Sequence, residues 1–578
     1  MFEIGLSLGG TVSAGAYTAG VLDFLIEALE RWETQKAAES DHPFEKRTVP
    51  WHQVRIKVIS GASGGSVCAA VLAKALGYGF PHIDSSMDPG TRQTLGPKNP
   101  LYALWVQTLD IAGFCDPNEG YSGKTDSLAS LLNPEPLLRG CDLAANFPQG
   151  VPNEVDPVAS PRPYVSEPLT LLMTLSNLTG VPYAVGYGGA TGRQQCYRRH
   201  ADYVRVESYY HGDGTPSVQW PDAYRVAGSP TASVPGGTVT SWHEVARFAR
   251  ASGAFPVGFP PVKLQRPAWH YYYQPISVGH GQGLVFPDLS SWGISPGANY
   301  TFLCVDGGAF NNEPVELARR HLAGWTSRND YEPQQARRAV ILVDPFADAS
   351  TPGPSDEQNV AAAGGALIGA WLANARFSTQ DFLLAAEAGI RSRFLITAKR
   401  TGEGGQSLTG GQALCSDPLG AFAGFLHPEY RNHDFFLGRR NCQYFLKEWF
   451  SLPAENEAVF GPAAQTAGLP HNTRGEIPLI PLCGTAATQQ LPYPWPSKAL
   501  DLDFARNGQT DSVAGMIRAR VDEVLRRVHK EFSWPERFVL AVGMMLRGRT
   551  AEFITQKVLA VVKKSLNTQG LYRNWWER

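Results

Sequence analysis

The segment at positions 54–76 reads VRIKVISGASGGSVCAAVLAKAL and is the most informative part of the chain. An apolar run over 54–59 predicts a buried strand, and the small residues over 66–76 predict a helix. Between them, Ser63 stands at the apex of a sharp turn with Gly61 and Gly65 on either side. A nucleophilic hydroxyl needs such an elbow, because neighbours without side chains leave room for a substrate carbonyl to approach. The pattern therefore predicts a serine nucleophile raised above a sheet.

A second strand–helix pair precedes this segment. Residues 2–8 have the pattern of a buried strand, 9–15 that of a loop of small residues, and about 16–32 that of a helix with one apolar stripe. Strands and helices in alternation indicate an α/β fold with a parallel sheet covered on both faces. Both loops leave the carboxyl ends of strands, where open α/β sheets bind their ligands. Further strands are expected at 169–175, 300–305 and 339–343.

The length of 578 residues and the change of pattern along the chain predict two parts. Residues 1–345 form the expected α/β domain, interrupted by loop-rich insertions at about 80–167 and 187–240. The 59 glycines and 43 prolines are consistent with such long loops. Residues 346–578 are expected to be mainly helical and to pack on or cap the first part, with the clearest helix at 511–532.

Composition and charge exclude several classes of protein. A formal net charge of −2 gives no general attraction to nucleic acid, so no nucleic-acid partner is expected. The eight cysteines contain no Cys-x-x-Cys pair, so neither a metal site nor a dense disulfide framework is expected. The first residues lack the basic segment of a secretory signal. The most apolar window, 360–375, is shorter than the roughly 20 residues that span a bilayer, and a cytoplasmic protein is expected.

A serine hydroxyl is a poor nucleophile without a base, and the sequence offers a carboxylate for this role. Asp306 follows the strand expected at 300–305 and precedes Gly307 and Gly308. Its side chain can therefore project into the crevice that holds Ser63. A carboxylate bonded directly to a serine hydroxyl can accept the proton without a histidine between them.

A loop of small residues can supply the donors for the negative charge that develops on the substrate oxygen. Gly9, Gly10 and Thr11 leave the first strand in the same layer as the serine elbow. Their backbone N–H groups are unshielded by large side chains and open onto a helix N-terminus, a combination that suits an oxyanion.

Four blocks of the sequence resemble the patatin-like phospholipase family: GGTVSAGAYTAGVL (9–22), GASGG (61–65), ARASGAFPVGFPPV (249–262) and DGGAFNNEPV (306–315). The resemblance implies a three-layer α/β/α domain that hydrolyses fatty acyl esters of lipids through a Ser-Asp dyad, without a metal or other cofactor. Carried over by position, Ser63 is the nucleophile and Asp306 the base. The N–H groups around Gly9, Gly10 and Thr11 then bind the oxyanion.

The loop departs from the family pattern of three glycines, one residue, then Arg or Lys and Gly. Thr11 stands at the third glycine, and Ser13 or Ala14 fills the basic position. A catalytically weakened, lipid-binding protein of the same fold is therefore one alternative. Another is an α/β-hydrolase-type esterase with His433 as the third member of a Ser-Asp-His triad, because the order of the three residues fits that fold.

Three features of the C-terminal part have both a structural and a functional interpretation. A helical segment at 424–442 is expected to be packed in the core, with Arg439 or Arg440 bridging two lobes. The basic helices before Trp575 and Trp576 either pack on the core or contact a membrane surface. Residues 361–372 either line an acyl groove or form a plain buried helix.

Overall fold

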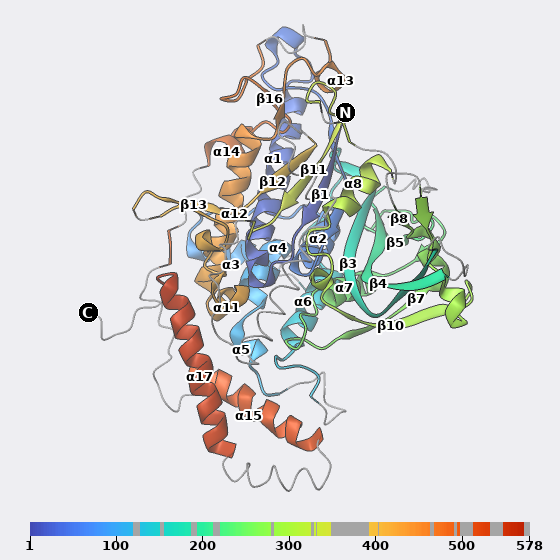
Figure 1. Cartoon of the computed structure of the whole chain (residues 1–578). Helices are drawn as coiled ribbons and strands as arrows, with labels where there is room; N and C mark the ends of the chain where they lie inside the picture. The colour runs from blue at the N-terminus through green and yellow to red at the C-terminus, as the bar shows by residue number, and fades with distance from the viewer. Residues whose placement is uncertain are drawn as a thin grey trace.

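A sheet that has ten strands within the described residues forms the centre of the structure, with helices on both of its faces (Figure 1). The sheet is mostly parallel, and a helical region follows it in the chain. This arrangement confirms the α/β class expected from the alternation of strands and helices. The computed structural model describes residues 1–118, 128–150, 155–186, 194–211, 220–278, 283–324, 329–330, 332–347, 392–402, 404–462, 468–489, 494–496, 512–531 and 547–571.

The strand order places the first two strands of the chain inside the sheet. Neighbouring strands are parallel from β12 to β3, whereas β4 and β10 pair with β3 in the antiparallel direction. β7 pairs with β10, also in the antiparallel direction. In sheet order the strands are β12 (Arg393–Ile396), β11 (Arg338–Val343), β1 (Phe2–Leu8), β2 (Val54–Gly61), β3 (Val165–Gly186), β4 (Gln194–Tyr209), β5 (Tyr224–Ala227) and β6 (Thr238–Val239), with β10 (Asn299–Val305) and β7 (Val262–Pro267) branching from β3.

Several strands of the sheet lie where the sequence pattern predicts none. β4, β5 and β6 fall inside the range 187–240 that was expected to be a loop-rich insertion, β7 precedes the strand expected at 300–305, and β12 follows residue 345, the expected end of the α/β domain. β4 looks polar because it carries buried charges that are paired in space. Arg205 forms a buried ion pair with Asp222, and Arg225 pairs with Glu207 at 3.4 Å. Buried charges are tolerated when they are paired, so a charged strand can lie within a sheet.

Helices cover the two faces of the sheet unequally. α1 (Gly15–Ala38), α2 (Gly64–Ala75) and α7 (Trp242–Ser252) pack on one face, and α8 (Val315–Ala323) packs on the other (Figure 1). By length and composition the helical stretch Val12–Ala38 could cross a membrane, but 94% of its apolar window is buried inside the fold. In this structure it is the central core helix.

α12 (Pro428–Glu448) packs along α1 and ties the last third of the chain to the first. A Cβ at Gly438 would overlap the carbonyl of Tyr17, so the two helices approach closely. The fully buried Arg439 bonds Asp23 and Glu27 of α1. The expected bridging arginine is therefore Arg439.

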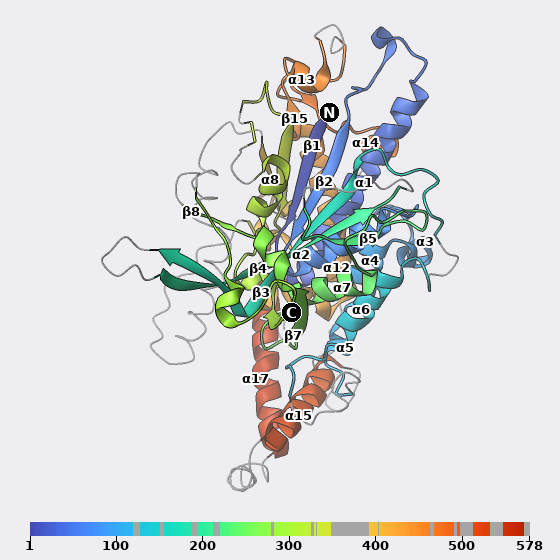
Figure 2. The same ribbon diagram turned by 90° about the vertical axis from the view of Figure 1, so that its right-hand side faces the viewer.

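The C-terminal helices α15 (Val513–Glu531) and α17 (Arg547–Thr568) contact each other and project away from the sheet (Figures 1 and 2). Together with Cys415, Leu426 and Tyr430 they enclose a smaller apolar cluster, separate from the main core. Trp575, Trp576 and residues 361–372 lie outside the described residues.

The remaining elements are α3 (Pro89–Leu95), α4 (Pro100–Tyr102), α5 (Ile111–Phe114), α6 (Glu135–Asn146), α11 (Pro418–Ala421), α13 (Glu457–Phe460), α14 (Gly484–Thr488), β8 (Ile276–Val278), β9 (Gly283–Val285), β13 (Lys399–Thr401), β14 (Ser407–Thr409), β15 (Ser451–Leu452) and β16 (Ile477–Pro478).

Candidate active site

Ser63 lies between β2 and α2, where its backbone has φ 50° and ψ −125°. A residue with a side chain rarely adopts a positive φ, so this is a strained elbow of the kind that presents a nucleophile. A Cβ at Gly61 would lie 2.6 Å from the backbone nitrogen of Ser66, and one at Gly65 would overlap the carbonyl of Leu8. Only glycine fits at both flanking positions, in agreement with the expected elbow.

Ser63 and Asp306 meet directly, although 243 positions separate them in the sequence. Ser63 Oγ donates a hydrogen bond of 2.6 Å to Asp306 Oδ2. Asp306 Oδ1 accepts the N–H of Gly308 at 2.7 Å, and a Cβ at Gly308 would come 2.9 Å from that oxygen. Ser63 is 8% exposed and Asp306 6% exposed. Both carboxylate oxygens of Asp306 thus accept a hydrogen bond, and the bond to Oδ2 comes from the Ser63 hydroxyl.

Burial raises the pKa of Asp306 from 3.8 to about 6, although the hydrogen bonds from Ser63 and Gly308 lower it. The cause is the loss of water around the anion, which favours the neutral acid. A carboxylate with a pKa near 6 is a stronger base than an ordinary aspartate and is still ionised at neutral pH. It can therefore take a proton from a hydroxyl at hydrogen-bond distance.

The backbone around Asp306 is fixed from three sides. Ser176 Oγ, on β3, donates to the carbonyl of Asp306 at 2.6 Å. The Asp306 N–H donates to the carbonyl of Ala254 at 2.9 Å. A Cβ at Gly307 would overlap the carbonyl of Thr174, so only glycine lets the turn lie against β3. These contacts hold the carboxylate at its place beside the elbow.

Ser252, at the end of α7, supports the elbow from behind. Its Oγ accepts the N–H of Ser63 at 3.0 Å and donates to Ser66 Oγ at 2.8 Å. Ser66 Oγ in turn donates to the carbonyl of Gly61 at 2.7 Å. Ser252 belongs to the block 249–262, but the sequence alone assigns it no role. The signal that could have found it is a polar side chain on the buried face of an amphipathic helix.

The N–H groups of Gly9 and Gly10 already have acceptors within the protein. Gly9 donates to the carbonyl of Val343 at 3.0 Å, and Gly10 donates to the carbonyl of Asn312 at 3.2 Å. Both were expected to bind an oxyanion, and this part of the expectation is corrected. Their N–H groups instead tie the loop to β11 and to the segment after Asp306.

Thr11 comes next in the same loop and is 1% exposed. Its hydroxyl has no hydrogen-bond partner among the described residues. It lies beside Gly64, because a Cβ on Gly64 would overlap Thr11 Oγ1. Within the described part of the chain, no acceptor takes the backbone N–H of Thr11 or of Gly64. The hydroxyl and N–H of Thr11 and the N–H of Gly64 therefore lie near Ser63 with no acceptor among the described residues.

Ser63 opens onto an apolar pocket of about 70 Å³, called the site pocket below. Gly64 and Val12 form its wall beside the nucleophile, and Trp105 lies on a π-helical turn at Ala103–Thr108 that forms another side. π-Helical turns are frequent at functional sites. Phe255, Phe259 and Phe425 are among the aromatic residues that also line the site pocket.

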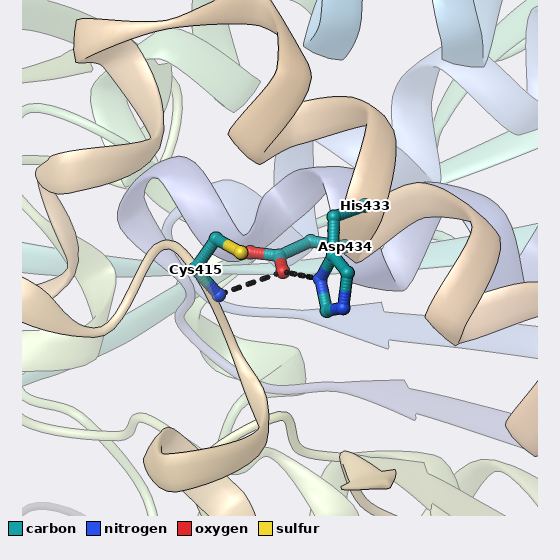
Figure 3. Close-up of side chains that lie close together, drawn as sticks. All are labelled: Cys415, His433 and Asp434. Carbon is teal, nitrogen blue, oxygen red and sulfur yellow. Dashed lines mark hydrogen bonds and ion pairs between the residues drawn. The ribbon is translucent and has the colours of Figure 1, made fainter. Parts of the chain in front are cut away.

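His433 belongs to a different cluster, on α12 (Figure 3). Its Nδ1 bonds Asp434 Oδ1 at 2.9 Å, and the same carboxylate accepts the N–H groups of Cys415 at 2.9 Å and of Ser416 at 3.0 Å. Since Ser63 donates straight to a carboxylate, the triad expected with His433 is not formed. One ligand atom each of Cys415, His433 and Asp434 lie within 4.8 Å of one another. Burial raises the pKa of the Cys415 thiol well above its usual value, so the thiol stays protonated. The role that the bonds support is to hold the loop at residues 415–416 against α12.

Comparison with known proteins gives one close match in sequence. The chain is 30% identical to the uncharacterized protein y4iI of Sinorhizobium fredii (strain NBRC 101917 / NGR234) over 598 residues, covering 96% of this chain and 81% of y4iI. The chain matches no protein-family model. Among solved structures it is similar to VipD from Legionella pneumophila, with 11% identity and a TM-score of 0.20 over 99% of this chain and 88% of that one. A score this low carries no inference about fold or function.

Proposed function

The chain belongs to the same family as y4iI of Sinorhizobium fredii, and we propose that it is a lipid acyl hydrolase of the patatin-like type. The reaction is the hydrolysis of a fatty acyl ester, as in a phospholipase A or an acylesterase. Support comes from the bond of 2.6 Å between Ser63 Oγ and Asp306 Oδ2, which carries the proposal. The apolar character of the site pocket supports an acyl chain as the group bound there.

In the proposed mechanism Ser63 Oγ attacks the ester carbonyl while Asp306 Oδ2 accepts its proton. The tetrahedral intermediate collapses, and the leaving alcohol takes the proton from Asp306. Water then attacks the acyl group on Ser63, with Asp306 again as the base, and releases the fatty acid. The raised pKa of Asp306, about 6, favours both proton transfers near neutral pH. No metal or other cofactor enters these steps.

The oxyanion of the intermediate is proposed to bind where Thr11 and Gly64 meet. The N–H of Gly64, the residue after the nucleophile, is a usual donor in a serine elbow. The N–H and the hydroxyl of Thr11 add two more donors, both buried beside Gly64. Loss of one such donor costs about 2.7–4 kcal/mol of transition-state stabilisation in well-studied hydrolases.

A fluorophosphonate probe tests the proposal, because it labels activated serine nucleophiles covalently. Labelling of the wild-type protein and of Ser290→Ala, but not of Ser63→Ala, is the expected result. Ser290 is an exposed serine far along the chain and serves as the matched control. Labelling that persists in Ser63→Ala would refute Ser63 as the nucleophile.

A second candidate is a lipid-binding protein of the same fold with little activity. The observation in its favour is that Val343 and Asn312 occupy the N–H groups of Gly9 and Gly10. This candidate predicts no fluorophosphonate labelling at Ser63 together with saturable binding of a fatty acid. Labelling with turnover of an ester would exclude it.

We also propose that the protein acts in the cytoplasm and contacts membranes peripherally. Val257 is 72% exposed, and its carbonyl accepts the N–H of Leu131, which is 44% exposed. Both lie at the edge of the region that carries Phe255 and Phe259, so an apolar rim stands near the site pocket. Replacing Val257 with Asp should reduce cosedimentation with phosphatidylcholine vesicles, and unchanged cosedimentation would contradict this part.

A further inference from the structure

A second apolar cavity lies beneath α15 and α17 and is called the distal cavity here. Its volume is about 410 Å³, and its walls include Ile517 and Val524 of α15 and Val558 of α17. Apolar atoms form almost all of its lining. The guanidinium of Arg520 is turned to the backbone, where it donates to the carbonyls of Leu131 at 2.6 Å and Ser130 at 3.1 Å. The cavity therefore suits a hydrocarbon.

One layer of aromatic rings separates the distal cavity from the site pocket. Phe425 lines both. The ring of Phe114 is in the wall of the distal cavity. Its centroid lies 4.9 Å from that of the Phe425 ring and 5.4 Å from that of the Phe259 ring in the site pocket. Phe422 of the distal cavity lies 5.6 Å from Phe255 of the site pocket. Phe425 is therefore part of a wall that the two spaces share.

The two spaces differ strongly in size. The site pocket has a volume of about 70 Å³, and the distal cavity has one of about 410 Å³. The distal cavity therefore supplies most of the apolar space that a long acyl chain would need.

The turn that carries Phe425 is joined to the loop beside the nucleophile. Ser13 Oγ donates to the carbonyl of Ala421 and accepts the N–H of Gly424 at 3.1 Å. Leu419 and Ala421 have left-handed backbones, with φ 64° and 71°, a conformation that is costly for residues with side chains. Residues 419–421 thus keep a strained backbone conformation where the turn is bonded to the Ser13 loop.

The other end of this turn is joined to α17. Ser565 Oγ accepts the N–H of Leu419 at 3.0 Å, and Gln569 donates to Asp417 Oδ2 at 2.9 Å. Phe425 therefore lies on a bridge between the catalytic loop and the helices over the distal cavity. Phe425 lines both spaces, so an acyl chain that reaches from Ser63 to those helices would lie against it.

We infer that the substrate is a long-chain fatty acyl ester, whose carboxyl end lies at Ser63 and whose methyl end lies in the distal cavity, with Phe425 as the residue between them. The inference rests on the proposed function for the chemistry at Ser63. The binding of the chain itself is independent of that chemistry.

The test measures fatty acid binding without turnover. Palmitate and butyrate are titrated by calorimetry into Ser63→Ala protein that carries a second change. Val524→Trp fills the distal cavity, and Val558→Trp fills it from a position that is 38% exposed. Thermal unfolding of each variant shows which of them keeps the fold and can be used. Ala560→Trp, exposed on α17, is the matched control.

A buried methylene contributes about fourfold to affinity, so a blocked cavity should lower the ratio of palmitate to butyrate affinity at least tenfold. The control should leave the ratio as it is. No binding of palmitate, or the same ratio in all variants, would overturn the inference.

Ester hydrolysis separates this inference from the proposed function. In protein with Ser63 intact, Val524→Trp should lower the ratio of turnover on p-nitrophenyl palmitate to turnover on the butyrate ester by a similar factor. If no ester is hydrolysed but the ratio of affinities falls, the proposed function fails and the distal cavity still binds the chain. If esters are hydrolysed with an unchanged ratio, the inference fails alone.

Discussion

Replacing Asp306 with asparagine is expected to stabilise the fold while it removes the proposed base. The carboxylate is buried, and its pKa is about 6 against an ordinary 3.8. Asparagine has nearly the same shape. Its oxygen can accept the N–H of Gly308, and its amide can donate to Ser63 Oγ, so both hydrogen bonds have a replacement.

The size of the effect follows from the pKa. A carboxyl group whose pKa is raised on folding contributes stability that is fully present below the unfolded value and is lost as the pH rises through the folded value. The difference between a pKa of 3.8 in the unfolded chain and one of about 6 in the folded protein corresponds to about 3 kcal/mol of stability. The wild type should lose this amount between about pH 4 and pH 6, and Asp306→Asn should not.

Thermal and urea unfolding between pH 4 and pH 8 measure the difference. The two proteins should be equally stable near pH 4, and the variant should be more stable by about 3 kcal/mol above pH 6. Asp330→Asn, at an exposed aspartate, is the control. A stability difference that stays constant across this range would show that desolvation of Asp306 is not its cause.

Four further results are expected. The kcat/KM for ester hydrolysis should rise as pH increases through about 6, where Asp306 loses its proton, and a flat profile from pH 5 to 7 would contradict its role. Ser63→Gly should be more stable than Ser63→Ala by about 1–2 kcal/mol in urea unfolding, because glycine relieves the positive φ. Thr11→Val should lower kcat about 10²–10³-fold, whereas Thr11→Ser keeps the hydroxyl and most of the rate. Arg439→Met should cost about 3 kcal/mol in unfolding experiments, since it removes the buried guanidinium from two carboxylates of α1 while Asp23 keeps its bond to His82, and a loss below about 1 kcal/mol would argue against the bridge.

Local patterns made much of the central sheet predictable. β1 begins and ends at the expected residues, and β10 and β11 each begin one residue earlier than expected. Ser63 could be recognised because the steric demands of its elbow are met by glycines next to it in the sequence. Asp306 could be found because a strand leads into it and two glycines follow.

Features that depend on distant residues could not be predicted in this way. The charges of β4 look like those of a surface loop until Asp222 is seen beside Arg205. Gly9 and Gly10 look like free donors until Val343 and Asn312, more than 300 positions away, are seen to accept their N–H groups. Pairings of this kind are set by the fold and leave no trace in the local pattern.

The bond between Ser13 and the turn that holds Phe425 bears on when the protein becomes competent during synthesis. A nascent chain of 345 residues has its serine and aspartate but lacks that turn, as well as the arginine that neutralises α1. We expect such ribosome-bound and prematurely terminated products to be inert, so the proposed activity would begin only after the segment up to Arg439 has been made.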